Sequence, residues 1–235
     1  MLMFLRFLIL SIFLLAGCGK TKQLVEQHGG MRDALRMGNT QSRITFEEIS
    51  AKPHAFAVGA LTDLEGEITI VDGQILVATT PDGASATSTS GTNDQSATLL
   101  TIAYVENWAK DRIPANTDFE TAVETVALRN GVNVDEPFPF YVYANTTSYD
   151  MHVINGFCPV ASPDLPERDQ PWRLHGKETG MLIVGFYAKN QEGVMTHHGS
   201  NIHIHGIDTS GKDVVSGHLD RVEVLAGSTI FVPAM

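Results

Sequence analysis

Two histidines with a regular spacing are the first candidates for chemistry in this sequence. His203 and His205 stand two residues apart in segment 201–207 (NIHIHGI), where isoleucines alternate with them. This alternation is typical of a β-strand, in which residues two apart lie on the same face. We therefore expect both imidazoles on one face and Ile202 and Ile204 in the opposite layer.

A third histidine follows where a neighbouring strand would place it. His218 comes after segment 208–216, which is largely polar, contains glycine and suits a turn between two strands. If the second strand returns alongside the first, His218 joins His203 and His205 on one face. Three neutral imidazoles suit zinc (Zn²⁺) and leave its fourth position open, as in catalytic zinc sites. Copper, nickel or iron would also accept these ligands, and a set of exposed or hydrogen-bonded histidines is the alternative without a metal.

Other histidines show no comparable pattern. His197 and His198 stand just upstream of the alternating segment, where we expect a solvent-exposed loop. His28, His54 and His175 are isolated in the sequence, so we assign no chemistry to them.

Strands must position the histidine group. Segment 67–79 (EITIVDGQILVAT) predicts a hairpin, because Asp72-Gly73 suits a type I′ turn and β-branched residues flank it. Segment 80–95 has no large apolar residue, which predicts a loop. This loop would be either a lid over a site or a flexible connection without a function of its own. Further strands are expected at 97–105, 140–144, 149–155, 181–188, 202–207, 219–224 and 229–232.

Short helices are expected around these strands. Segment 31–38 (MRDALRMG) has helical character and ends in glycine, and Thr45 with Glu48 resembles a capping box. Thr117 and Glu120 form a second such box, for a helix that Gly131 is placed to end. The many expected strands and few short helices predict an α+β fold with mostly antiparallel sheets and peripheral helices.

Composition excludes several classes of protein. The chain has 235 residues, 43% of them hydrophobic, and its 16 basic and 27 acidic residues give a net charge of −11. Nucleic acid is not an expected partner, because phosphate binding needs a basic face. Two cysteines exclude a disulfide scaffold and a zinc site built from three or four cysteines.

The first residues predict export. Arg6 is followed by the apolar run 7–16, which has the length of a signal-peptide core and is too short to span a membrane. Leu15-Ala-Gly-Cys18 then resembles a bacterial lipobox, although an ordinary signal peptide with a chance cysteine is the alternative. We predict a lipoprotein signal peptide at 1–17, a lipid on Cys18 and a tether at 18–23. The protein would be anchored outside the cytoplasm, in a Gram-negative host on the outer membrane.

Lipidation of Cys18 would leave Cys158 without an intrachain partner. We expect Cys158 to be a buried small apolar residue and not a nucleophile.

Several segments together resemble the α-acetolactate decarboxylases. Their order and rough spacing fit that family over about residues 24–225. The Gly-Glu hairpin and the His-x-His and Gly-His segments are the most specific. The segments are 31–35 (MRDAL), 64–73 (LEGEITIVDG), 140–141 (FY), 180–186 (GMLIVGF), 201–205 (NIHIH) and 217–220 (GHLD).

This resemblance implies a fold, a ligand set and a reaction. The fold would be two-lobed, with mixed and antiparallel sheets, an N-lobe at about 24–135 and a metal-binding C-lobe at about 136–235, in a possible homodimer. Zinc would be held by the three histidines, and Glu67 would reach the site. Without the resemblance, the position of Glu67 favours an exposed carboxylate at the start of a strand. The family splits the small molecule 2-acetolactate into acetoin and carbon dioxide. Zinc would stabilise the resulting enediolate and Glu67 would protonate it.

Two departures from the family leave the function open. Asn155 stands where the family has an arginine near the metal, and His152 would face away from Asn155 on a regular strand. The chain also ends soon after His218, without a counterpart of a C-terminal glutamate that returns to the metal in the family. The first hypothesis is decarboxylation of acetolactate or a related 2-hydroxy-3-keto acid. The alternatives are a non-catalytic, membrane-tethered protein that binds a metal or small ligand, and another metal-assisted lyase or hydrolase.

Overall fold

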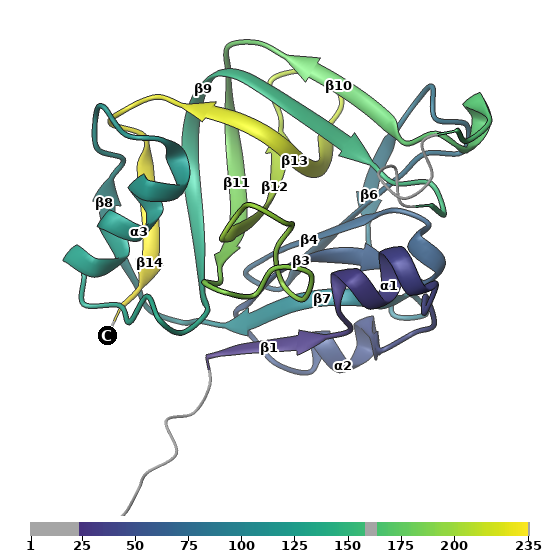
Figure 1. Cartoon of the computed structure of the whole chain (residues 1–235), viewed down its shortest axis with the longest axis horizontal. Helices are drawn as coiled ribbons and strands as arrows, with labels where there is room; N and C mark the ends of the chain where they lie inside the picture. Colours follow the sequence, from purple (N-terminus) through teal and green to yellow (C-terminus); the bar gives the residue numbers. More distant parts are fainter. Residues whose placement is uncertain (1–23, 158–163, 235) are drawn as a thin grey trace, which may run out of the picture.

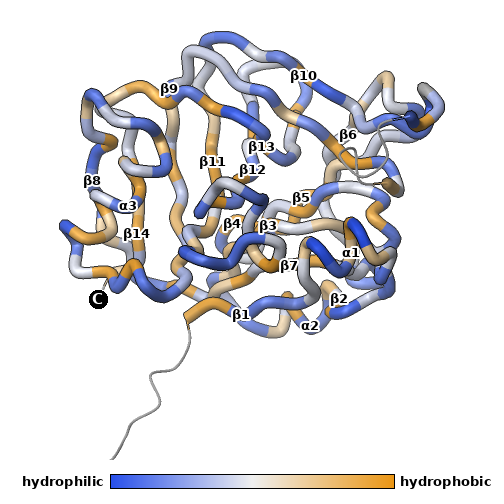
Figure 2. Tube along the Cα trace, in the orientation of Figure 1, coloured by the Kyte–Doolittle hydropathy of each residue, from blue (hydrophilic) through white to orange (hydrophobic). Residues whose placement is uncertain are grey.

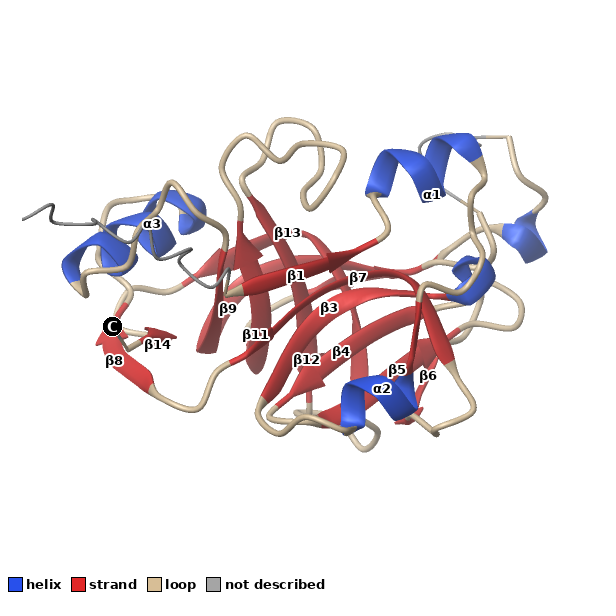
Figure 3. Cartoon of the chain, turned by 90° about the horizontal axis from the view of Figure 1, so that it is seen from below, coloured by secondary structure: helices blue, strands red, loops and turns tan. Residues whose placement is uncertain are grey.

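The computed structural model describes residues 24–157 and 164–234. The predicted signal peptide at 1–17, the tether at 18–23 with Cys18, and Cys158 lie outside this part of the chain. Two seven-stranded sheets form the body, and the helices lie at its periphery (Figures 1 and 3). All pairings between the named strands are antiparallel, so the predicted α+β class is confirmed.

The first sheet contains the predicted hairpin. Asp72 and Gly73 join its two strands with φ values of 47° and 81°, and a type I′ turn requires such positive values. Segment 80–95 differs from the loop prediction, because Thr87–Ser90 pairs with Thr79–Leu76. In spatial order the strands are β1 (Val25–His28), β7 (Ser96–Tyr104), β3 (Ala55–Leu61), β4 (Glu67–Val71), β5 (Gln74–Thr79) and β6 (Thr87–Ser90), with β2 (Ile44–Thr45) also on β7.

Two short α-helices border the first sheet, and both have the predicted ends. Helix α1 (Met31–Met37) ends at Gly38, whose φ of 72° is in the left-handed region. Helix α2 (Phe46–Ser50) has the capping box of Thr45 and Glu48. The described chain also has two 3₁₀ turns, η1 (Thr62–Leu64) and η2 (Glu167–Asp169).

The second sheet is organised by one long strand. Strand β9 (Phe138–Val153) is continuous where two strands were predicted, because its first half pairs with β11 and its second half with β13. Strands β9, β11, β12 and β13 therefore close into a ring of hydrogen-bonded neighbours. The other members of this sheet are β8 (Trp108–Arg112), β10 (Trp172–Gly176), β11 (Thr179–Tyr187), β12 (Ile202–Asp208), β13 (Val215–Val224) and β14 (Thr229–Pro233).

The start of helix α3 (Phe119–Arg129) corrects one prediction. Its N-cap is Asp118, whose side chain accepts a hydrogen bond from the backbone N–H of Thr121, and not Thr117. Glu120 is therefore free to accept hydrogen bonds from Ser200 and Asn201, at the residues that precede β12. The helix thus positions the strand that carries two of the histidines.

The two sheets face each other across a shared apolar layer. Val58 and Ala103 of the first sheet pack in one cluster with Val184 and Phe186 of the second. Figure 2 shows the hydrophobic residues concentrated on the interior strands. Among residues 24–157 and 164–234, no helix has both the length and the apolar character needed to span a membrane.

The lobe boundary at about residue 135 stays a prediction. The chain passes from the first sheet to the second between Tyr104, the end of β7, and Trp108, the start of β8. The reason is that β8 pairs with β14, and α3 packs on the core of the second sheet.

Candidate metal centre

Strand register brings histidines from three strands into one row. His205 of β12 pairs directly with His218 of β13, and His218 pairs with His152 of β9. Arg173 of β10 pairs in turn with His152. Directly opposed residues on antiparallel strands share a face, so the row runs across the face that meets the first sheet. His203 joins it, while Ile202 and Ile204 pack into the opposite layer as the alternation predicts.

His203, His205 and His218 form a group that could hold a metal ion. One nitrogen from each lies within 4.8 Å of the others, and all three side chains are buried. Within the described chain, His203 Nδ1 and His205 Nε2 are buried without any hydrogen-bond partner. Such atoms are costly to bury, and a metal ion would give them the partner they lack. The residues present therefore fit a zinc ion.

Burial keeps these three imidazoles in the form that binds metals. Removal from water lowers the pKa of His203 and of His218 well below its ordinary value, and it lowers the pKa of His205 to about 3. Their mutual repulsion as cations acts in the same direction. Metal ions bind the neutral ring, so no proton has to be displaced near neutral pH.

This charge state predicts how the metal-free protein responds to pH. Below the ordinary histidine pKa of 6.5, the three histidines are protonated in the unfolded chain but stay neutral in the folded protein. The folded state therefore becomes less stable as the pH is lowered. Glu67, with its pKa raised from 4.5 to about 7, acts in the opposite direction but is a single group. Each unmatched proton changes stability by about 1.4 kcal/mol per pH unit. We expect the melting temperature in EDTA to be lower at pH 5 than at pH 7, and a flat or rising profile would contradict these charge states.

Thr69 orients one candidate ligand from the opposite sheet. Its Oγ1 lies 3.0 Å from His205 Nδ1, which leaves His205 Nε2 facing the other histidines. Thr69 stands on β4 two residues after Glu67, so both side chains face the second sheet while Ile68 and Ile70 pack on the other side. A hydrogen bond of this kind fixes the ring orientation of a metal ligand.

We predict that Thr69→Val weakens zinc binding by about 10–100-fold, the usual effect of losing an outer partner of a ligand. Thr101→Val is the matched control, because Thr101 is also buried in the first sheet but bonds to Gln27. Zinc affinity is measured by competition with a chromophoric chelator. Equal affinity of the two variants would show that Thr69 does not orient His205.

Glu67 is buried beside the histidine group, which excludes the exposed alternative for this residue. Its side chain lies 3.7 Å from His205 Nε2 and 3.8 Å from His152 Nε2. Burial raises its pKa to about 7. The preceding Gly66 has a φ of 151°, and a Cβ there would lie 2.3 Å from the carbonyl oxygen of Ala78. Only glycine permits this close turn into β4, which explains the Gly-Glu pair.

His152 is a site residue that no local sequence pattern indicates. It is buried, and its Nδ1 lies 2.9 Å from a carboxylate oxygen of Asp220 that also accepts from Arg173 at 3.3 Å. Its Nε2 faces Glu67, and its ring centroid lies 4.8 Å from that of His218. The sequence shows that His152 stands on a strand, but the register that pairs it with His218 joins residues far apart in the chain.

Asn155 is not brought to this group. It follows the end of β9, where its side-chain amide donates to the backbone carbonyl of Arg168 at 2.8 Å. It is also absent from the lining of the cavity beside the histidines. Asparagine therefore does not take the place of the family arginine at the candidate metal centre.

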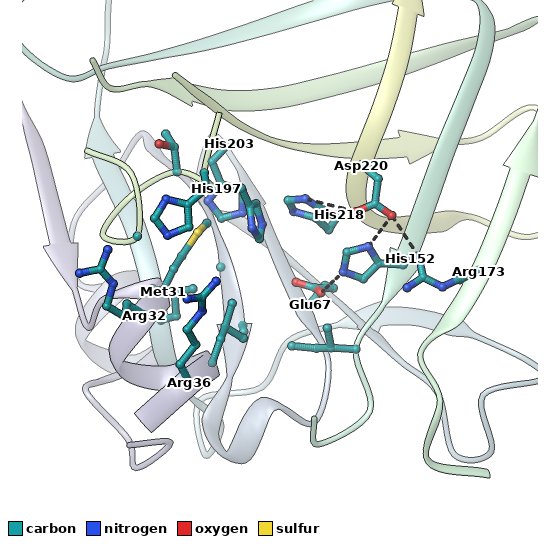
Figure 4. Close-up of a pocket in the computed structure, with 18 residues that line it drawn as sticks. Met31, Arg32, Arg36, Glu67, His152, Arg173, His197, His203, His218 and Asp220 are labelled. Carbon is teal, nitrogen blue, oxygen red and sulfur yellow. Dashed lines mark hydrogen bonds and ion pairs between the residues drawn. The ribbon is translucent and has the colours of Figure 1, made fainter. Parts of the chain in front are cut away.

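A cavity of about 290 Å³ opens beside the histidines and Glu67 (Figure 4). Residues of α1, β3 and the loop before β12 form its other walls. His197 is exposed as predicted, but its ring lies 4.8 Å from that of His218, at the edge of this cavity. His54 and His175 form surface pairs with Asp72 and Asp150 and do not line it.

A buried group of three histidines beside a carboxylate and a cavity defines a candidate metal-dependent active site. No protein-family model matches the sequence, and no curated protein does either. Solved structures do match. The chain has the fold of the α-acetolactate decarboxylases.

Three of these structures resemble nearly the whole chain. The α-acetolactate decarboxylase of Bacillus subtilis strain 168 has a TM-score of 0.69 at 18% identity, over 90% of this chain and 85% of that one. The acetolactate decarboxylase of Bacillus subtilis subspecies spizizenii gives 0.67 at 17%, over 90% and 86%. A Staphylococcus aureus protein of unknown function, described as similar to α-acetolactate decarboxylase, gives 0.67 at 14%, over 90% and 85%. At these identities the likeness establishes the fold.

Proposed function

We propose that this protein is a zinc-dependent carboxy-lyase, a divergent relative of the α-acetolactate decarboxylases. Its substrate would be 2-acetolactate or a related 2-hydroxy-3-keto acid, and its products acetoin or the corresponding hydroxyketone and carbon dioxide. The observation that carries the proposal is the cavity beside the converging histidines, with Glu67 on its wall. A site that only stored a metal would not need this space.

The proposed reaction needs charge stabilisation and one proton. The bond between C2 and the carboxylate breaks, carbon dioxide leaves, and the electron pair stays behind as an enediolate. When bound, zinc would supply Lewis-acid stabilisation of that negative charge. Glu67 then protonates carbon, and a carboxyl group with a pKa of about 7 is suited to hold and release a proton near neutral pH.

His152 would restore the proton that each turnover consumes. Its Nε2 faces Glu67 at 3.8 Å, and its Nδ1 is held by Asp220 at 2.9 Å. The Asp220 side chain is 41% exposed, so the pair connects the buried glutamate to solvent. Asp220 also fixes the orientation of the ring, as a carboxylate does for a catalytic histidine.

Two observations favour a second candidate, a non-catalytic protein that binds a metal or small ligand. Asn155 supplies no positive charge at the site. The His197 ring lies 4.8 Å from His218 and 6.0 Å from His203, and an imidazole there could occupy the open metal position. This candidate predicts stoichiometric metal without turnover.

Export and anchoring belong to the proposal as well. We propose that Cys18 carries a lipid and holds the domain on the outer side of a bacterial membrane. Labelling with a radioactive or clickable fatty acid in cells tests this directly, with Cys18→Ser as the control. The homodimer stays a prediction of the resemblance, to be tested by light scattering.

Acetoin formation separates the two candidate functions. The mature domain, loaded with one equivalent of zinc, is incubated with racemic 2-acetolactate at pH 7, and acetoin is assayed against a protein-free control. Turnover lost on chelation and restored by zinc supports the lyase. Bound zinc without acetoin above the control rejects acetolactate as substrate and favours the binding protein.

A further inference from the structure

Two arginines of α1 line the cavity on the side opposite His152 and Arg173. Arg32 and Arg36 stand four residues apart, so their side chains lie on one face of the helix. Figure 4 shows Arg36 extending from α1 toward the histidines. Arg32 donates its backbone N–H to Gly193, and its guanidinium packs against that residue. Among the side chains that the structure describes, the ion pairs involve neither Arg32 nor Arg36.

Neither arginine is neutralised by a carboxylate of its own helix or across the cavity. The chain has 27 acidic and 16 basic residues, yet two like charges face one another across a single helical turn. The acid on the same helix, Asp33, is already engaged by Asn39 at 2.6 Å and Arg43 at 3.3 Å. Across the cavity, Arg173 is paired with Asp220 at 3.3 Å. The positive charge on α1 is thus available for a ligand.

We infer that Arg36, supported by Arg32, binds the carboxylate of an anionic substrate. The inference rests on the proposed function and deepens it, because it assigns the recognition of a small 2-hydroxy acid to α1. A guanidinium matches a carboxylate with two parallel hydrogen bonds. With the carboxylate on α1, the hydroxyl and ketone oxygens of the same molecule face the histidines and the reacting carbon faces Glu67. The charge that Asn155 does not provide thus comes from another element.

This role predicts an effect on binding and little effect on the chemical step. The negative charge moves from the carboxylate to the enediolate as the bond breaks, so the contact stabilises the bound substrate at least as well as the transition state. Loss of this contact therefore raises KM and does not lower kcat. For Arg36→Gln we expect KM to rise about tenfold, as for one hydrogen bond to a charged group. Arg36→Lys keeps the charge but cannot form the two parallel hydrogen bonds, so its KM should lie between those of the wild type and Arg36→Gln.

Binding of two matched ligands tests the inference without turnover. The first is 2,3-dihydroxy-2-methylbutanoate, which lacks the ketone needed for decarboxylation, and the second is 2-methylbutane-2,3-diol, in which a methyl group replaces the carboxylate. Calorimetric titration of the zinc-loaded wild type, Arg36→Gln and Arg32→Gln gives the preference for the anion. Arg129→Gln is the control, because it removes the same charge from α3, outside the cavity.

We expect the wild type and the Arg129→Gln protein to bind the anion at least tenfold more tightly than the diol. Arg36→Gln should lose most of this difference, while its affinity for the diol is unchanged. The inference is overturned if the wild type shows no preference for the anion, or if Arg36→Gln retains that preference. A preference that depends on Arg36 in a protein that forms no acetoin would reject the proposed reaction and keep the carboxylate site.

Discussion

Replacing His205 with glutamine is expected to abolish stoichiometric zinc binding. His205 has no exposed surface, and its Nε2 has no hydrogen-bond partner in the described chain. It also pairs across the strands with His218, so its loss leaves two ligands on separate strands. Loss of an outer partner of a ligand costs about 10–100-fold in affinity, and loss of the ligand itself should exceed the upper end of that range. Bound zinc is measured by mass spectrometry after gel filtration, and affinity by chelator competition.

The control for this variant must separate a lost ligand from a lost fold. His54→Gln also removes a histidine, but from a surface pair with Asp72. Both variants are melted in EDTA, where the metal makes no contribution. We expect His205→Gln to fold and His54→Gln to bind one zinc. One tightly bound zinc in a folded His205→Gln protein would rule out the three-histidine centre.

Replacing Glu67 with glutamine is expected to lower kcat for acetolactate by about 10²–10⁴-fold, the usual contribution of a positioned acid or base. Glutamine has nearly the same size and cannot donate an acidic proton. Zinc content should stay at one equivalent, because the carboxylate lies 3.7 Å from His205 and is not one of the three histidine ligands. Acetoin formation under saturating substrate gives kcat directly.

The neighbouring Glu65 provides a matched control. It is exposed and lies just before Gly66 and the start of β4, so Glu65→Gln should retain the activity of the wild type. Glu67→Gln should also fold at least as stably as the wild type in EDTA at pH 8. The reason is that burial already disfavours the charge on Glu67, as its raised pKa indicates. Activity within a few-fold of the wild type in a folded Glu67→Gln protein would remove this residue from the reaction.

Local patterns predicted those features of the fold that depend on nearby residues. The Asp72-Gly73 turn needs only two residues with positive φ, and the capping box of Thr45 and Glu48 spans a single helical turn. The alternation of histidine and isoleucine in β12 predicted which side chains share a face. Where two local solutions competed, as for Thr117 and Asp118, the pattern did not decide, because both residues can cap a helix.

Strand register and the packing of the two sheets decide which residues meet at the candidate site. A period of two tells which residues share a face of a strand, but it does not tell which residue stands opposite on the next strand. His152 joins the row because β9 pairs with β13 in one particular register, and Thr69 reaches His205 because the first sheet covers the second.

The sequence by itself determined three histidines on two strands, a glutamate that follows a glycine, and a net negative, β-rich body. Only the tertiary structure decided that Glu67 is buried, that His152 and Asp220 stand behind it, and that Arg36 faces the same cavity from α1. Burial, pKa and cavities arise where segments far apart in the chain exclude water together. No local pattern carries that information.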